Sequence, residues 1–212
     1  MTSIEQMHQL SQLGVEFAGM IFYPKSPRYV FKFGLNGADV KKAKVKPYKV
    51  GVFVDASYDE IMKQVDDFGL DMVQLHGHET PYECSRVANS VDVIKAFRFV
   101  ETDHVSWMIK DFHNSADMFL FDTGITSKTK EQNLYGGTGR KFDWSLLKGV
   151  QVNKPFFLSG GIEPTDVSLI KQFMKEPVAK DLFVVDINSR FETSPGVKDV
   201  NRIRQFIDEL KS

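Results

Sequence analysis

Residues 49–77 read KVGVFVDASYDEIMKQVDDFGLDMVQLHG, and the order of their apolar and polar segments decides the expected fold. KVGVFVD (49–55) and MVQLHG (72–77) are short apolar runs without clean alternation, which is typical of parallel strands covered on both faces. Residues 58–68, between them, carry a helical pattern. A strand, a helix and a second strand of these lengths predict a right-handed β–α–β unit.

The same alternation recurs along the chain. Further short apolar runs occupy residues 17–23, 92–99, 118–123, 155–161 and 182–189. Helical stretches lie between several of them, and NRIRQFIDEL (201–210) forms the last one. Repeated strand–helix units predict an α/β fold, and the chain length suits one domain spanning residues 1–212.

Two α/β architectures compete, an open doubly wound sheet and a closed (β/α)8 TIM barrel. Several expected strands end in polar or glycine-rich residues, namely at 76–77, 122–123, 159–161 and 186–189. In a barrel all of these ends meet around one pocket, whereas an open sheet gathers them only near its switch point. No GxGxxG motif follows the first strand, so we expect the barrel.

The expected barrel is incomplete, because seven strands are counted and a helix precedes the first of them. Thr2 and Ser3 can cap that helix, and Ile4, Met7 and Leu10 recur at helical spacing. We therefore expect the first β-strand to be missing and a seam to lie open between strands 17–23 and 182–189. Such edges predict strand distortion, solvent-filled disorder or self-association into a homo-oligomer.

Composition excludes several classes of function. The formal net charge of -1 gives no electrostatic case for a nucleic-acid or membrane partner. The single cysteine, Cys84, excludes an internal disulfide and a multi-cysteine zinc site, and fits a reducing cytoplasm. Its place in the expected helix after Thr80-Pro81 predicts a small packing residue. With neither a long apolar run nor a signal peptide in the sequence, we expect a cytoplasmic protein.

A phosphate site is predicted at the last two strand ends. LSGGIEP (158–164) places Gly160 and Gly161 before a helix, and DINSRFE (186–192) supplies Asn188, Ser189 and further backbone amides. The loops after the seventh and eighth strands commonly hold phosphate in this fold. The alternative is that the two glycines form a tight turn only.

Three other polar residues are candidates for chemistry. Asp122 ends an apolar strand and would be partly desolvated, which suits a general acid or a structural aspartate. His76 could orient a ligand or form a hydrogen bond with the backbone. His78, two residues further on, suggests a metal site, but no third ligand is evident, so no metal is expected. Arg28 follows two prolines and suits a carboxylate, unless it is a solvated surface side chain. GGTGRKFDW (136–144) reads as a mobile lid.

Together these segments resemble phosphoribosylanthranilate isomerase, an enzyme family of tryptophan biosynthesis. The resemblance rests on ordered motifs that run to the C-terminus: GMIFYPKSPRYV, VGVFVD, VQLHGHE, VIKAF, LFDT, GGTGRKFDW, FLSGGI and VVDINSRFE..PG.KD. It implies a (β/α)8 barrel and a cofactor-free Amadori rearrangement. N-(5-phosphoribosyl)anthranilate would become 1-(2-carboxyphenylamino)-1-deoxyribulose 5-phosphate.

The resemblance also implies roles for the site residues. Asp122 would be the general acid, Arg28 would face the anthranilate carboxylate, and His76 would lie at the pocket wall. Asp186 would add a polar contact near the sugar. The phosphate would fall to the backbone and side chains of Gly160, Gly161, Asn188 and Ser189.

One departure from the family limits the expected activity. The family's general base is a cysteine in a Lys-[Ile/Val]-Cys-Gly motif on the first strand, and Met1 stands about where the residue after that motif would fall. We therefore expect a truncated chain with impaired catalysis, since Cys84 does not match the motif. Two other interpretations stay open: a non-catalytic phosphosugar-binding barrel, and indole-glycerol-phosphate synthase, for which Lys95 alone is a weak candidate.

Overall fold

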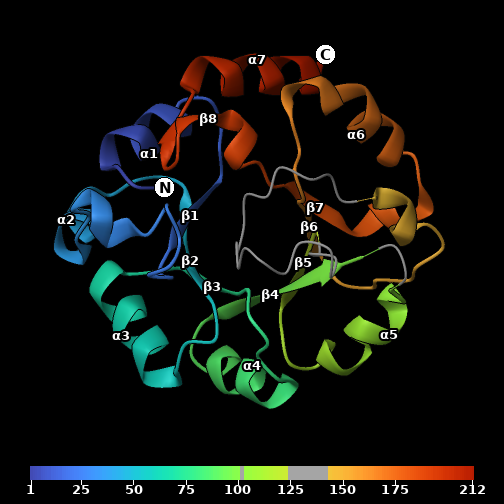
Figure 1. Ribbon diagram of the computed structural model, residues 1–212, viewed down its shortest axis with the longest axis horizontal. Coiled ribbons are helices and arrows are strands. Elements are labelled where there is room, and N and C mark those ends of the chain that lie inside the picture. The colour runs from blue at the N-terminus through green and yellow to red at the C-terminus, as the bar shows by residue number, and fades with distance from the viewer. Residues whose placement is uncertain (101–102, 124–142) are drawn as a thin grey trace.

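The computed structural model describes residues 1–100, 103–123 and 143–212. Within them, seven parallel strands form one curled sheet in which each strand pairs only with its neighbours in sequence. The strands are β1 Phe17–Ile21, β2 Tyr48–Phe53, β3 Met72–Leu75, β4 Asp92–Phe99, β5 Met118–Thr123, β6 Phe156–Leu158 and β7 Leu182–Val185. This order has no switch point, so the doubly wound alternative is excluded and the sheet curls as a barrel does (Figure 1).

Helices surround this sheet on its outer side (Figure 1). They are α1 Ile4–Ser11, α2 Gly37–Lys42, α3 Tyr58–Phe68, α4 Pro81–Ala88, α5 Val105–Ile109, α6 Val167–Phe173 and α7 Val200–Lys211. Capping boxes begin two of them, Ser57 with Glu60 at α3 and Thr80 with Glu83 at α4. None of the helices described has the length and apolarity needed to cross a membrane.

The predicted seam between β1 and β7 is confirmed, because these two strands do not pair in the described part of the chain. The helix layer nevertheless continues across the seam: Leu10 of α1 packs in one buried cluster with Ile203 and Phe206 of α7. The sheet is distorted there as expected, since the β6–β7 register shifts between Phe156 and Phe157. The molecule is therefore a ring of helices around an open sheet.

The first two residues lie beside the free edge of β1. The Met1 α-amino group donates to the carbonyl of Gly19, and the Thr2 hydroxyl donates to the carbonyl of Gly196. Gly196 belongs to the turn between β8 Glu192–Ser194 and β9 Val197–Lys198, a short antiparallel hairpin that follows β7. These contacts bring the chain start and the hairpin together at the seam.

Apolar side chains fill the inside of the curled sheet and leave its strand ends to polar groups. One buried cluster on the strands comprises Val50, Met72, Ile94, Ala96, Leu120 and Phe157. A larger cluster packs the outer face of the sheet against the helices. Because the interior is filled by side chains, a ligand can enter only where the strands end or along the open seam.

Candidate functional site

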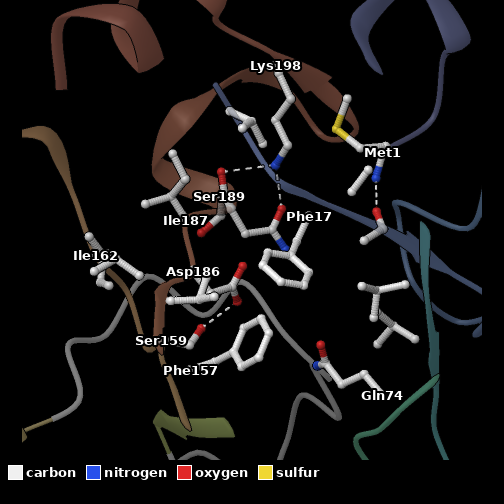
Figure 2. A pocket seen from close by; sticks show the side chains of 18 of the residues that line it. Met1, Phe17, Gln74, Phe157, Ser159, Ile162, Asp186, Ile187, Ser189 and Lys198 are labelled. Carbon is white, nitrogen blue, oxygen red and sulfur yellow. Dashed lines mark hydrogen bonds between the residues drawn. The ribbon is translucent and has the colours of Figure 1, made fainter. Parts of the chain in front are cut away.

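A cavity of about 460 Å³ lies at the carboxyl ends of the strands and extends along the seam. Strand-end residues line its polar part, and Phe17, Phe157 and Val184 line its apolar part (Figure 2). The volume is in the range that holds one small-molecule ligand. All of the polar side chains predicted for the site border this one cavity: Arg28, His76, Asp122, Asp186, Asn188 and Ser189.

Gln74, His76 and Asp122 form a polar row across the ends of β3 and β5. The Gln74 amide nitrogen lies 2.6 Å from His76 Nδ1, so in the neutral ring Nδ1 accepts and Nε2 carries the proton. Nε2 faces Asp122 Oδ2 at 3.3 Å, and it has no hydrogen bond within the described residues. His76 therefore presents a donor beside the Asp122 carboxylate at the cavity wall.

Asp186 lies opposite, just beyond the end of β7, and the Ser159 hydroxyl donates to its Oδ2 at 2.9 Å (Figure 2). Burial raises the pKa of Asp186; the hydrogen bond from Ser159 opposes this, and the charge of Asp122 adds to it. Asp122 and Asp186 thus border one cavity as two interacting carboxyl groups. Such an arrangement is suited to proton transfer.

The Arg28 guanidinium is held by the carboxylate of Glu192. Its Nε donates to both oxygens of the Glu192 carboxylate, at 3.0 and 2.8 Å, and its Nη2 lies 2.7 Å from Glu192 Oε2. The Arg28 side chain is 11% exposed and that of Glu192 is 2% exposed. The alternative of a solvated surface arginine is therefore excluded.

Lys198 extends this ion pair toward the next turn. Its Nζ lies 3.0 Å from Glu192 Oε1 and 2.7 Å from Asn188 Oδ1 (Figure 2). Burial lowers the pKa of Lys198, while the neighbouring Glu192 carboxylate opposes that shift. Two basic side chains and one acidic side chain thus stand together at the cavity.

The predicted phosphate turns lie side by side at the ends of β6 and β7. Gly161, Asn188 and Ser189 line the cavity, whereas Gly160 does not border it. Gly160 and Gly161 have φ values of 94° and 69°, a left-handed backbone that glycine adopts without strain. The Asn188 carboxamide oxygen accepts from Lys198, which leaves the Asn188 NH2 group, the backbone amides and the Ser189 hydroxyl as the groups of these turns that can donate to an anion.

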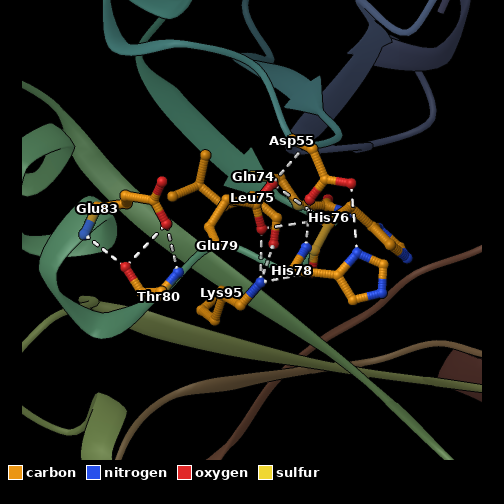
Figure 3. Close-up of polar contacts among 10 residues, drawn as sticks. Asp55, Gln74, Leu75, His76, His78, Glu79, Thr80, Glu83 and Lys95 are labelled. Carbon is orange, nitrogen blue, oxygen red and sulfur yellow. Dashed lines mark hydrogen bonds and ion pairs between the residues drawn. The ribbon is translucent and has the colours of Figure 1, made fainter.

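Next to this site, the loop after β3 is held by a buried ion pair (Figure 3). Lys95 Nζ lies 2.6 Å from Glu79 Oε2 and also donates to the carbonyl of Gly77. Glu79 accepts hydrogen bonds from the backbone N–H groups of Asp55 and Gly77. Lys95 is 3% exposed and does not border the cavity, which removes the one lysine that favoured an indole-glycerol-phosphate synthase.

The remaining candidates lie away from the cavity. His78 is exposed and bonds Asp55 instead of joining His76 (Figure 3). Among the described residues, no three His, Cys, Asp or Glu side chains gather closely enough to hold a metal ion. Cys84 is fully buried in the core, where burial raises the pKa of its thiol to about 11. The predicted lid at 136–144 lies, apart from its last two residues, outside the described chain.

Sequence reasoning missed the roles of Gln74, Glu192 and Lys198. All three stand within the motifs VQLHGHE and VVDINSRFE..PG.KD, yet no role was assigned to them. Glu192 contacts a residue 164 positions earlier in the chain, a separation that neither periodicity nor a short motif reports. The available signal for Glu192 and Lys198 was their charge, because both lie in a short turn-rich segment after β7.

Comparison with known proteins gives one consistent answer. The sequence profile of a family described as "N-(5'phosphoribosyl)anthranilate (PRA) isomerase" matches residues 1–209. An N-(5'-phosphoribosyl)anthranilate isomerase of Phocaeicola vulgatus is 35% identical over 208 residues, which cover 98% of this chain and 93% of the relative.

Two solved structures are similar to this protein over its whole chain, and each match covers 95% of the solved chain. The phosphoribosyl anthranilate isomerase of Thermotoga maritima is 30% identical with a TM-score of 0.80. A second isomerase structure, 27% identical with a TM-score of 0.74, is in complex with reduced 1-(o-carboxyphenylamino)-1-deoxyribulose 5-phosphate.

Proposed function

Since this chain belongs to the phosphoribosylanthranilate isomerase family, we propose that it binds N-(5-phosphoribosyl)anthranilate in the cavity and isomerises it to 1-(2-carboxyphenylamino)-1-deoxyribulose 5-phosphate. The reaction is a step of tryptophan biosynthesis. The observation that carries the proposal is the meeting of a guanidinium, two carboxyl groups and two amide-rich turns around one cavity. That set matches a substrate with a carboxylate at one end and a phosphate at the other.

The proposed roles follow the chemistry of the rearrangement. A carboxylic acid protonates the ribose ring oxygen, the C1–O bond breaks, and a Schiff base to the anthranilate nitrogen remains. A base then removes the C2 proton, and the resulting enolamine becomes the ketone. We assign the acid to Asp122, beside His76, and a sugar contact to Asp186. Arg28 binds the carboxylate, and the turns with Gly160, Gly161, Asn188 and Ser189 bind the phosphate.

The base in this proposal is not Cys84. That residue is the only cysteine of the 212, it lies outside the cavity, and its thiol stays protonated near neutral pH because burial raises its pKa to about 11. A missing general base typically slows an enzyme about 10²–10⁴-fold. We therefore expect turnover by this polypeptide to be slower by that factor than turnover by family members with a cysteine base.

A non-catalytic phosphosugar-binding barrel is the second candidate function, and one pair of measurements separates the two. Calorimetric titration with reduced 1-(o-carboxyphenylamino)-1-deoxyribulose 5-phosphate reports binding, and the loss of substrate fluorescence reports turnover. For the isomerase we expect binding together with turnover above background. Asp122→Asn should abolish that turnover and leave the affinity within about threefold, because the amide keeps the shape of the side chain but cannot donate the acid proton.

Three other outcomes would contradict parts of this proposal. Binding without any turnover favours the phosphosugar-binding barrel for this polypeptide. No binding by the unsubstituted chain contradicts both functions. Equal turnover by the unsubstituted chain and Asp122→Asn would remove Asp122 from the mechanism.

The cellular setting is part of the same proposal. We infer that the protein acts in the cytoplasm on a small-molecule substrate, without a nucleic-acid or membrane partner. We also propose that copies of the chain associate through the open seam, since Phe183 of β7 is 54% exposed there and an unpaired strand edge seeks a partner.

A further inference from the structure

We propose that the β8–β9 hairpin couples the two anion-binding ends of the cavity, with Glu192 as the positioning residue of Arg28 and Lys198 as the link from Glu192 to the phosphate-side turn. The inference rests on the proposed function, because it concerns how the carboxylate and the phosphate of the substrate are held. Neither the comparisons nor the motifs assign a role to these two hairpin residues.

The Arg28–Glu192 ion pair fixes the orientation of the guanidinium. Arg28 uses Nε and Nη2 for the Glu192 carboxylate, so the guanidinium plane is fixed by a two-pronged ion pair. Among the residues that the structure describes, Nη1 donates to no protein group, which leaves one edge of the guanidinium for a ligand. An arginine held in this way loses little side-chain freedom when a carboxylate binds.

Lys198 lies between Glu192 and Asn188. Glu192 and Lys198 are direct partners across the hairpin, so the backbone itself sets the two side chains beside each other. Lys198 Nζ has three hydrogens and three acceptors: Glu192 Oε1 at 3.0 Å, Asn188 Oδ1 at 2.7 Å and the Asn188 carbonyl at 3.4 Å. Lys198 thereby joins the carboxylate end of the cavity to the turn proposed for the phosphate.

Arg28, Lys198 and Glu192 together hold two cations and one anion, a net positive charge that favours an anionic ligand and that the nearby Asp186 carboxyl group opposes. Glu192 stays ionised, because the hydrogen bond from Arg28 and the charge of Lys198 together outweigh burial and lower its pKa. Among the residues that the structure describes, Asp186 and the Met1 α-amino group are the other ionisable groups that face the cluster. Burial lowers the pKa of the latter to about 5, so it adds no charge at neutral pH.

A merely structural ion pair would behave differently from a positioning one. If Glu192 only stabilises the fold, its substitution lowers the melting temperature and weakens all ligands alike. If it positions Arg28, its substitution weakens only ligands that carry the carboxylate. Lys198 touches both ends, so its substitution should weaken carboxylate and phosphate ligands together.

The experiment titrates the full chain and its variants with three probes in a calorimeter. The probes are reduced 1-(o-carboxyphenylamino)-1-deoxyribulose 5-phosphate, its anilino counterpart without the carboxylate, and inorganic phosphate. For Glu192→Gln we expect the carboxylated probe to bind about 10- to 100-fold more weakly, since a charge-assisted contact is misplaced. The other two probes should change by less than about twofold. For Lys198→Met we expect all three to weaken by about tenfold or more.

Matched variants separate positioning from folding. Glu192→Asp and Lys198→Arg keep the charge. If the ion pairs re-form, each should recover at least half of the affinity that Glu192→Gln or Lys198→Met loses, measured on a logarithmic scale. Lys63→Met removes an exposed ion pair on α3 and should leave all three affinities unchanged. Thermal melts show whether each variant is folded at the titration temperature.

Two results would overturn the inference. An equal loss for the carboxylated and the carboxylate-free probe in Glu192→Gln means that Glu192 has only a structural role. Unchanged affinities in both hairpin variants mean that the hairpin does not act on the site at all. If the unsubstituted chain binds neither sugar probe, the proposed function itself fails, which is a distinct outcome.

Discussion

Cys84 shows how its surroundings set the chemistry of a single side chain. Cys84 is a buried residue of α4 in the apolar core, and burial raises the pKa of its thiol to about 11. The same residue type in a cavity beside cationic groups would ionise more readily and could act as a base. The chemistry available to this cysteine is therefore decided by its location.

We expect Cys84 to resist alkylation in the folded protein. At pH 8 only about one thiol in a thousand would be ionised, so iodoacetamide should react about 100-fold more slowly than with free cysteine. Mass spectrometry over time measures this rate, and the same chain in 8 M urea is the control, where labelling should be fast. Rapid labelling under native conditions, or ligand affinity lost in Cys84→Ser, would contradict the assignment of a packing role.

At the scale of single elements, the strands beside the seam are shorter than their apolar runs. The sequence predicted strands at 17–23 and 182–189, and the structure has Phe17–Ile21 and Leu182–Val185. Pairing on one side only does not explain this shortening, because β6 pairs on both sides and keeps only Phe156–Leu158 of the predicted 155–161. By contrast, β4 has partners on both sides and spans all of the residues predicted for it, Asp92–Phe99.

The loop after β3 depends on the Glu79–Lys95 ion pair, whose side chains are 5% and 4% exposed. Lys95→Met leaves the Glu79 carboxylate buried without its cation, and we expect the free energy of unfolding to fall by about 3–5 kcal/mol. Urea unfolding monitored by circular dichroism measures this change. Lys63→Met, which breaks the exposed pair with Asp67, should cost less than about 1 kcal/mol. Similar losses of unfolding free energy in the two variants would show that the buried pair stabilises the fold no more than the exposed pair does.

At the scale of the whole molecule, the helix ring is closed and the sheet is not. Helices α1 and α7 pack together through Leu10, Ile203 and Phe206. Beneath them, the Phe17 and Phe183 rings lie 5.8 Å apart across the seam, with no strand pairing in the described residues. The cavity therefore runs from the strand ends into the seam, and apolar surface is exposed along it.

We expect this exposed seam to cause concentration-dependent self-association. Sedimentation velocity between about 1 and 100 µM should show dimers or larger species at the upper end, because an unpaired edge with apolar side chains buries surface by association. Phe183→Ser should shift the distribution toward the monomer, whereas Trp107→Ser, at an even more exposed position on α5, should not. A monomer at every concentration would exclude association through the seam.

The candidate site was predictable from sequence where its residues end strands. Asp122 and Asp186 each follow an apolar run, and a parallel barrel-like sheet gathers such ends on one face whatever the details of packing. The partner of Arg28 was not predictable in this way. Its contact with Glu192 joins the loop after β1 to the hairpin after β7, and these two segments meet only because the sheet curls.

The sequence by itself determined the alternation of strands and helices and the resemblance to one enzyme family. Those features are local, since they follow from apolar periodicity, capping residues and ordered motifs. Only the tertiary structure decided that α1 and α7 pack together across the seam, and that Glu192, itself paired with Lys198, holds Arg28. These outcomes depend on packing and on charge pairing between distant segments, which no short stretch of sequence encodes.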